Sequence, residues 1–254
     1  MRRILHWYLP TAATLAGIVL FGYGLVAFAR GDLGVPLSDG ARFAASPTPA
    51  VKQDELRMMI LGDSLARGTG DVSGLGIGGN LDAELGRMKR KRSPMVNVAV
   101  NGARTRDLLK LLDSRNVQKL IGDANVVVVS IGGNDLFGDA ETRSNPPANP
   151  DAVIGRVLDS VVEVVGRIRT ANPAARIFLV GLYNPFTGSD YGKLVSRFVN
   201  RWNGELVRRF EGDADLTVVQ TSDLFSHSSR LSLDRFHPGE EGYRLIANRI
   251  ANSL

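Results

Sequence analysis

The 254-residue chain contains no cysteine. This absence excludes disulfide bonds, thiolate nucleophiles, cysteine-ligated zinc and the attachment of a lipid to a cysteine. An oxidising compartment is compatible with the absence but is not indicated by it.

Histidine is nearly as scarce, with three in the chain. A serine nucleophile needs a base that titrates near neutral pH, which favours histidine. His6 lies in an apolar N-terminal segment, and His227 lies in a polar loop without a carboxylate three residues before it. His237 follows Asp234 by three residues and precedes Pro238, which biases the backbone of His237 away from helix. Elimination therefore makes His237 the candidate base and Asp234 the group that orients it.

Excess charge is also small, at a formal +5. Part of it lies in Lys89–Arg92, directly after the helix-like stretch 78–88. We interpret this cluster as a solvated helix end, where cations complement the helix dipole; contact with anionic lipid or glycan is the alternative. No aromatic or arginine-lined platform accompanies it, so we expect no nucleic-acid partner.

The N-terminus carries the one long apolar run. Ile4–Ala29 contains no acidic or basic residue except His6 and follows Arg2 and Arg3. Leu9–Phe28 alone would span about 30 Å as a helix, and the arginines predict a cytoplasmic N-terminus. The end of the run, residues 27–29, also fits a signal-peptide cleavage site, but its apolar part exceeds the usual ~7–15 residues. An uncleaved membrane anchor is favoured over a removed signal peptide. Both place the remaining chain outside the cytoplasmic membrane, either anchored to it or secreted.

The sequence pattern divides the chain into three parts. Residues 1–30 are the anchor or signal peptide. Residues 31–55 are rich in Pro, Ala, Ser and Gly without periodicity and predict a flexible linker. Residues 56–254 are long enough for one domain with a sizeable core.

The domain alternates strand-like and helix-like segments. Asp151–Ala171 has apolar residues at helical spacing, and Lys193–Phe210 and Gly239–Leu254 are the later helices. The expected strands are short runs rich in Val, Ile and Leu, as fully buried parallel strands are. They are Leu56–Leu61, Met95–Val100, Asn125–Ile131, Arg176–Leu182 and Leu216–Gln220. This alternation predicts a three-layer α/β/α sandwich around a five-stranded parallel sheet.

Chemically useful residues follow three of these strands. Ser64 follows the first, Gly102 the second and Asn134 the third. Sites in open α/β sheets form outside the carboxyl ends of the strands, so these motifs predict a single active site. The backbone N–H groups of Ser64 and Gly102 and the Asn134 amide are candidate donors to an oxyanion. An ordinary turn at Gly102 and a turn-capping role for Asn134 are the alternatives.

Three other motifs near these residues do not predict a function of their own. Gly74–Gly79 matches a dinucleotide-binding pattern but follows no strand and has no acidic residue about 20 positions on, so a flexible loop is favoured. Ala66 stands where the nucleophile elbow of lipases has glycine. Asp63 and Asp135 are interpreted as local hydrogen-bonding residues rather than acid–base groups.

The constellation resembles the SGNH hydrolase (GDSL esterase/lipase) superfamily over about residues 56–254. Gly62–Asp71 and Ile131–Phe137 further resemble a bacterial branch of lysophospholipase-like esterases attached to the cell envelope. The resemblance implies a flavodoxin-like fold, no metal or other cofactor, and ester hydrolysis through an acyl-enzyme. It implies a catalytic triad and an oxyanion hole at these positions: Ser64, Asp234 and His237, and Ser64, Gly102 and Asn134.

We therefore expect a serine esterase acting on lysophospholipids or O-acylated carbohydrates. Acyl transfer by the same triad is the alternative, and a non-catalytic envelope binding module is a weaker one. Four apolar residues are candidates for an acyl pocket, although a core position is favoured for them: Leu136, Phe137, Phe186 and Phe225.

Overall fold

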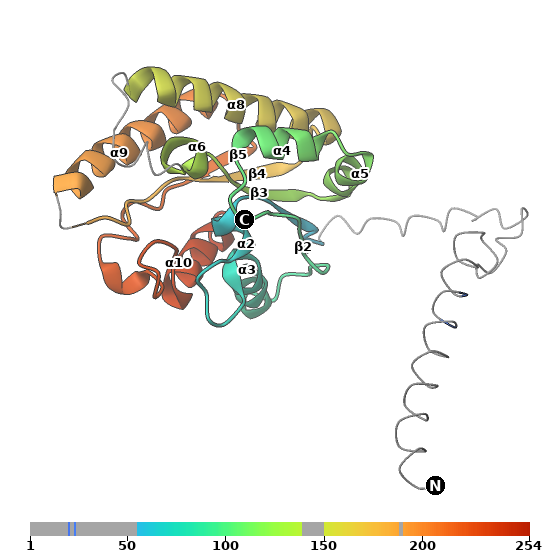
Figure 1. Cartoon of the computed structure of the whole chain (residues 1–254). Coiled ribbons are helices and arrows are strands. Elements are labelled where there is room, and N and C mark those ends of the chain that lie inside the picture. The colour runs from blue at the N-terminus through green and yellow to red at the C-terminus, as the bar shows by residue number, and fades with distance from the viewer. Residues whose placement is uncertain (1–19, 21–22, 24–54, 139–149, 188–189) are drawn as a thin grey trace, which may run out of the picture. The chain divides into compact units, whose positions relative to one another are not determined.

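The computed structural model describes Leu20, Tyr23 and residues 55–138, 150–187 and 190–254. The chain divides into two units, Met1–Lys52 and Gln53–Leu254 (Figure 1). Leu20 and Tyr23, both helical and exposed, are the described part of the first unit. The rest of the expected anchor, and the linker apart from Glu55, lie outside the described residues. Among the helices that the structure describes, none combines the length and apolarity needed to cross a membrane.

The second unit is built on a sheet of five parallel strands in the order β2-β1-β3-β4-β5. This confirms the expected α/β architecture and its strands. Apart from β2, each strand is slightly shorter than its apolar run, since the ends of the runs continue into the connecting loops. The strands are β1 (Met58–Gly62), β2 (Val96–Asn97), β3 (Val126–Ser130), β4 (Arg176–Val180) and β5 (Leu216–Val219).

Helices cover both faces of the sheet (Figure 1). One face carries α4 (Thr105–Leu112), α5 (Arg115–Asp123), α6 (Gly133–Phe137), α8 (Pro150–Ala171) and α9 (Asp190–Phe210). The other carries α2 (Ser64–Arg67), α3 (Gly76–Arg87) and α10 (Glu240–Ala251). The three long predicted helices are confirmed within a few residues of their expected ends.

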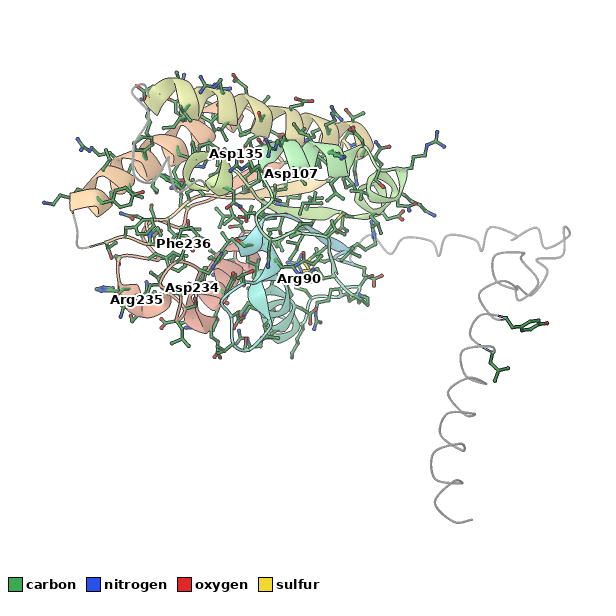
Figure 2. The ribbon with its side chains drawn as sticks, in the orientation of Figure 1. Arg90, Asp107, Asp135, Asp234, Arg235 and Phe236 are labelled. Atoms are coloured by element: carbon green, nitrogen blue, oxygen red, sulfur yellow. The ribbon has the colours of Figure 1, made fainter. Side chains whose placement is uncertain are left out.

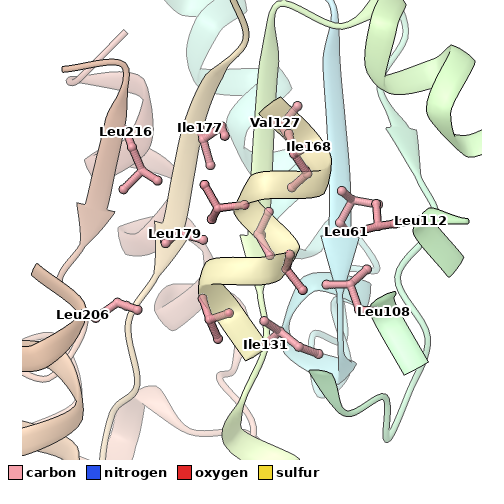
Figure 3. Packing of buried hydrophobic residues seen from close by; sticks show 14 of the residues in the cluster. Leu61, Leu108, Leu112, Val127, Ile131, Ile168, Ile177, Leu179, Leu206 and Leu216 are labelled. Atoms are coloured by element: carbon pink, nitrogen blue, oxygen red, sulfur yellow. The ribbon is translucent and has the colours of Figure 1, made fainter. Parts of the chain in front are cut away.

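The core divides into two clusters because successive side chains of a strand point to opposite faces. In β1, Met59 and Leu61 pack under α4 and α8, while Met58 and Ile60 pack against α3 and α10. Figure 3 shows the first cluster, with residues such as Leu108 and Ile168 closing over the strands. All residues of β1 and β3 are buried, so the apolar runs reflect burial on both faces.

Two details differ from the expectation. β2 is regular over two residues, because it is an edge strand that follows Pro94. Its backbone still bonds to β1 further along, with the N–H groups of Val98 and Val100 donating to Ile60 and Gly62 at 3.0 and 2.9 Å. The predicted flexible loop at Gly74–Gly79 is wrong in its second half: α3 begins at Gly76, since an apolar face packs this segment on the sheet.

The strand order reverses between β1 and β3. Connections from these neighbouring strands leave toward opposite faces, which opens a crevice at their carboxyl ends. Ser64 follows β1 and Asn134 follows β3, so both stand at this crevice.

Candidate active site

Ser64 is the first residue of α2, on a tight turn that leaves β1. Gly62 adopts φ +128°, and a Cβ atom there would lie 1.8 Å from the Ser130 carbonyl oxygen of β3. The turn therefore depends on glycine for both its backbone angle and its packing. The Ser64 N–H begins a helix and has no intrahelical partner, so it remains available as a donor.

Asp63, the residue before Ser64, stabilises this turn through hydrogen bonds. Its Oδ1 accepts hydrogen bonds from the Leu65 N–H and the Ser130 hydroxyl, both at 3.1 Å, as expected of a local hydrogen-bonding residue. Only 5% of Asp63 is exposed. Burial raises the pKa of the Asp63 carboxyl to about 6, against these hydrogen bonds, which favour its charged form.

His237 joins the serine from the far end of the chain. Its Nε2 lies 2.9 Å from Ser64 Oγ, and its Nδ1 lies 2.6 Å from Asp234 Oδ2. A carboxylate can only accept at this contact, so Nδ1 carries the proton and Nε2 is free to accept from the serine hydroxyl. The structure thus brings the three predicted catalytic residues into one hydrogen-bonded chain.

Asp234 is fixed by several donors. Its Oδ1 accepts from the Ser232 hydroxyl at 2.6 Å and from the N–H groups of Phe236 and His237 at 2.8 and 2.9 Å. Partial burial acts to raise the pKa of Asp234, but the hydrogen bonds from Ser232, His237 and the backbone outweigh it and hold the pKa well below its usual range. Asp234 is therefore charged at neutral pH.

The loop that carries these residues lies on the same side of the sheet as α10 (Figure 2). An isolated bridge pairs Leu231 with Pro238, and the Ser232 N–H donates to the His237 carbonyl at 2.8 Å. The hydroxyl of Tyr183, which follows β4, donates to the Phe236 carbonyl at 2.7 Å. The loop is thus tied to itself and to the strand ends.

The other two candidate oxyanion donors lie in the β2–α4 connection (Gly102) and at the start of α6 (Asn134). Gly102 is exposed at φ +76°, and no atom lies within 4 Å of where its Cβ would stand. The Asn134 side-chain nitrogen donates to the Ala103 carbonyl at 3.0 Å, which leaves its second N–H for a ligand. Gly102 follows β2 and Asn134 follows β3, the two strands that pair with β1, which Ser64 follows.

A cavity of about 60 Å³ opens beside Ser64 and His237. Phe137 and Phe186, expected mainly as core, line it together with Leu182 and Phe236. Leu136 and Phe225 do belong to the core, at 4% and 2% exposed. A second hollow of about 430 Å³ is lined by Gly102 and by residues of α4 such as Leu108.

Sequence reasoning missed the supporting residues around the site. Ser232, Tyr183 and Thr105 were not singled out, although each bonds to a segment that carries a candidate catalytic or oxyanion residue. Ser232 stands two positions before Asp234, a spacing at which a hydroxyl can reach a carboxylate. Tyr183 and Thr105 bond to residues 53 and 30 positions away, and no local signal indicates such partners.

Comparison with known proteins identifies the family. The model of the GDSL-like Lipase/Acylhydrolase family matches residues 60–245. The uncharacterized protein YpmR of Bacillus subtilis (strain 168) is 34% identical over 213 residues, covering 80% of this chain and 82% of YpmR. The spore germination lipase LipC of Bacillus licheniformis is 24% identical over 209 residues, covering 77% and 94%. Among solved structures, the lipase Lip_vut3 from a goat rumen metagenome has a TM-score of 0.68 at 21% identity, covering 78% and 97%.

Proposed function

The chain belongs to the GDSL-like lipase/acylhydrolase family and is a serine hydrolase that acts on esters, and we propose that it hydrolyses short-chain acyl esters through Ser64, His237 and Asp234. The observation that carries this proposal is the hydrogen-bonded chain from Ser64 Oγ through the His237 ring to Asp234, at 2.9 and 2.6 Å. The serine hydroxyl, weak by itself, gains a base in hydrogen-bond reach, and the base gains an anion that fixes its tautomer.

The first half of the reaction forms an acyl-enzyme. Ser64 Oγ attacks the ester carbonyl carbon while its proton passes to His237 Nε2. The carbonyl oxygen becomes an oxyanion, which accepts from the N–H groups of Ser64 and Gly102 and from the free N–H of the Asn134 amide. The carbon–oxygen bond to the alcohol then breaks, and His237 gives its proton to the leaving oxygen. Asp234 remains charged and stabilises the imidazolium.

The second half releases the acid. Water enters where the alcohol stood, and its proton passes to His237 Nε2 as its oxygen bonds to the acyl carbon. The tetrahedral intermediate collapses, the bond from Ser64 Oγ to the acyl carbon breaks, and the serine recovers its proton from His237. The same three donors stabilise the oxyanion in this step.

The cavity beside Ser64 supports a short acyl group. Its volume of about 60 Å³ is small, which favours a short acyl group over a long chain. Its walls are apolar side chains, including Phe137 and Phe186, which suit a hydrocarbon. These features favour an O-acylated carbohydrate over a long-chain lysophospholipid.

The proposal places the domain on the outer face of a bacterial membrane, held by residues 1–30. Its support is the sequence: Arg2 and Arg3 precede an apolar run long enough to span a bilayer. Mass spectrometry of the mature N-terminus, with membrane fractionation, tests it. A chain that begins after residue 29 and is found in the medium contradicts anchoring.

The activity is tested with the full chain and p-nitrophenyl esters of two to sixteen carbons. We expect highest kcat/KM with acetate or butyrate, and a loss of ~10⁴-fold or more in Ser64→Ala. Ser160→Ala is the matched control and is expected to keep full activity, because Ser160 is a half-buried serine on α8 whose hydroxyl donates to the Arg156 carbonyl of the same helix. A fluorophosphonate probe should label the wild type and Ser160→Ala but not Ser64→Ala. Equal hydrolysis by wild type and Ser64→Ala refutes the assignment, and a preference for palmitate refutes the short-chain part.

A further inference from the structure

Gly102 and Asn134, two of the candidate oxyanion donors, lie on separate segments of the chain. A residue without a role in the proposed reaction joins these two segments. Asp135, on α6, directs its carboxylate at Thr105, the first residue of α4. Its Oδ2 accepts from the Thr105 N–H at 3.0 Å, and its Oδ1 accepts from the Thr105 hydroxyl at 2.8 Å. Thr105 is 4% exposed, so both of its donors need a partner inside the protein.

The bonds between Asp135 and Thr105 form a bridge between two segments, and each segment carries a candidate oxyanion donor. Asp135 follows Asn134 directly, and Thr105 stands three residues after Gly102. A second bond runs parallel to it, from the Asn134 amide to the Ala103 carbonyl. Residues 134–135 are thus joined to residues 103–105 through two residue pairs, Asp135–Thr105 and Asn134–Ala103. Since the first segment follows β3 and the second follows the edge strand β2, these bonds set the distance between the two donors.

We propose that Asp135 is a positioning residue for ester hydrolysis, whose bridge to Thr105 holds the Gly102 N–H and the Asn134 amide at the spacing an oxyanion requires. The inference rests on the proposed function and goes beyond it by assigning a task to a residue outside the triad and the oxyanion hole. Oxyanion donors work at 2.7–3.1 Å from the developing charge, and a displacement of about 1 Å costs roughly 10² in rate.

A carboxylate suits this task better than an amide. Two donors converge on it from Thr105, and a carboxylate offers an acceptor oxygen to each. Asparagine of the same shape can accept from the Thr105 N–H, but its NH₂ group would face the hydroxyl, which must then accept instead of donate. Two bonds to a charged acceptor are thereby replaced by weaker bonds between neutral groups. Asp135→Asn therefore loosens the bridge without changing the volume of the side chain.

The competing explanation is that Asp135 merely caps α4. Asp107 provides a matched control, because its Oδ2 accepts from the Arg104 N–H at 3.0 Å and caps the same helix. Figure 2 labels Asp107 on α4 and Asp135 on α6. The Asp107 carboxylate bonds within the first turn of α4 and pairs with Arg106, so Asp107→Asn weakens the cap while the bridge from α6 stays in place.

The test compares both variants in the full chain with p-nitrophenyl butyrate. We expect Asp135→Asn to lower kcat by about 10–100-fold with KM within twofold, since oxyanion contacts act in the transition state. Its affinity for a trifluoromethyl ketone, which forms an oxyanion on Ser64, should fall by a similar factor. Asp107→Asn should keep kcat within about twofold at a comparable drop in melting temperature. Equal kcat losses in the two variants, or none in Asp135→Asn, overturn the positioning role.

A double-mutant cycle separates positioning from general damage. If Asp135 acts through the oxyanion donors, its replacement should cost about threefold or less in an Asn134→Ala background. The same factor in both backgrounds contradicts the proposal. Activity that survives Ser64→Ala contradicts the proposed function, whereas Ser64-dependent activity that Asp135→Asn leaves unchanged contradicts the positioning role alone.

Discussion

Asp63 and Asp234 stand on opposite sides of the same hydrogen-bonded chain, and their carboxyl groups respond to the protein in opposite ways. Asp63, next to Ser64, is almost fully buried, and burial raises its pKa to about 6. Asp234, behind His237, has a side chain 44% exposed, and its hydrogen bonds hold its pKa below the usual range. The serine side of the site is built by packing, and the histidine side is built by polar bonds.

Substitutions should damage the serine side and the histidine side of the site for different reasons. Packing around Gly62 and Asp63 leaves no space for an added atom, so changes of volume should be costly there. The Asp234 side chain is partly exposed, so loss of a donor or acceptor should matter more there than loss of volume. Each of the following substitutions tests one side of this comparison.

Asp234→Asn should have the largest effect. The asparagine oxygen can still accept from Ser232 and the backbone, but its NH₂ group would face His237 Nδ1 and select the tautomer with the proton on Nε2. His237 could then not accept the serine proton, and kcat should fall by ~10⁴-fold with a small change in stability. Ester hydrolysis and urea denaturation measure the two quantities. Asp223→Asn, which breaks an ion pair with Arg249, should leave kcat unchanged; a loss below tenfold in Asp234→Asn contradicts the role of Asp234.

Gly62→Ala should have the next largest effect. The new Cβ would stand 1.8 Å from the Ser130 oxygen at a φ of +128°, so β1 and β3 must separate. We expect a loss of roughly 3 kcal/mol or more in the free energy of unfolding. Gly155→Ala in α8 has open space at the same atom and should stabilise by about 0.5–1 kcal/mol. Equal stability of the two variants in urea would show that the turn is not held by packing.

Asp63→Asn tests the raised pKa through the pH dependence of stability. A carboxyl whose pKa rises from 3.8 to about 6 on folding binds its proton more tightly in the folded state. The stability this provides is present below pH 3.8 and is lost as the pH rises through 6, by roughly 3 kcal/mol. Asparagine keeps the acceptor oxygen but does not ionise. Its free energy of unfolding relative to wild type should therefore increase by about that amount from pH 4 to pH 7.

Asp223→Asn provides the opposite sign for the same measurement. The hydrogen bond and charge of Arg249 lower the pKa of Asp223 below its ordinary value. Its contribution to stability is present at neutral pH and is lost as the pH falls, so the difference between this variant and wild type should change in the other direction. Parallel curves for the two variants would contradict the comparison.

Ser232→Ala should have the smallest effect. It removes the 2.6 Å hydrogen bond to Asp234 Oδ1, while two backbone N–H groups still donate to that oxygen. We expect a loss of about 1 kcal/mol in stability and a fall of roughly two- to fivefold in kcat. Ser226→Ala, an exposed serine of the same region, should change neither. Loss of most of the activity in Ser232→Ala would show that the backbone donors alone do not hold Asp234.

The fold was predictable because its signals are local. Runs such as Asn125–Ile131 are too apolar and too short for anything but a buried strand, and Asp151–Ala171 shows helical spacing over its whole length. The order of the motifs along the chain then indicated which residues meet at the carboxyl ends of the strands. The edge strand β2 was overestimated, since apolar sequence does not reveal whether a strand has one neighbour or two.

What the sequence left open depends on three-dimensional contacts. Phe137 and Phe225 are both apolar aromatics near strand ends, yet one lines the cavity and the other lies in the core. The bridge from Asp135 to Thr105 joins positions 30 residues apart, and no local sequence pattern predicts that these two residues bond. The opposite pKa shifts of Asp63 and Asp234 were equally hidden, because burial and hydrogen bonding arise only after the chain has folded.

The described part of the second unit enters β1 at its amino end, where the Leu56 N–H donates to the Lys91 carbonyl at 2.8 Å, while Ser64 stands beyond the carboxyl end of the same strand. A strand of five residues separates the two points by about 17 Å. Whatever is attached ahead of residue 56 therefore joins the domain at the rim opposite the chemistry. If this enzyme is immobilised on a resin, attachment ahead of residue 56 should therefore keep the resin away from the end of the sheet that carries Ser64.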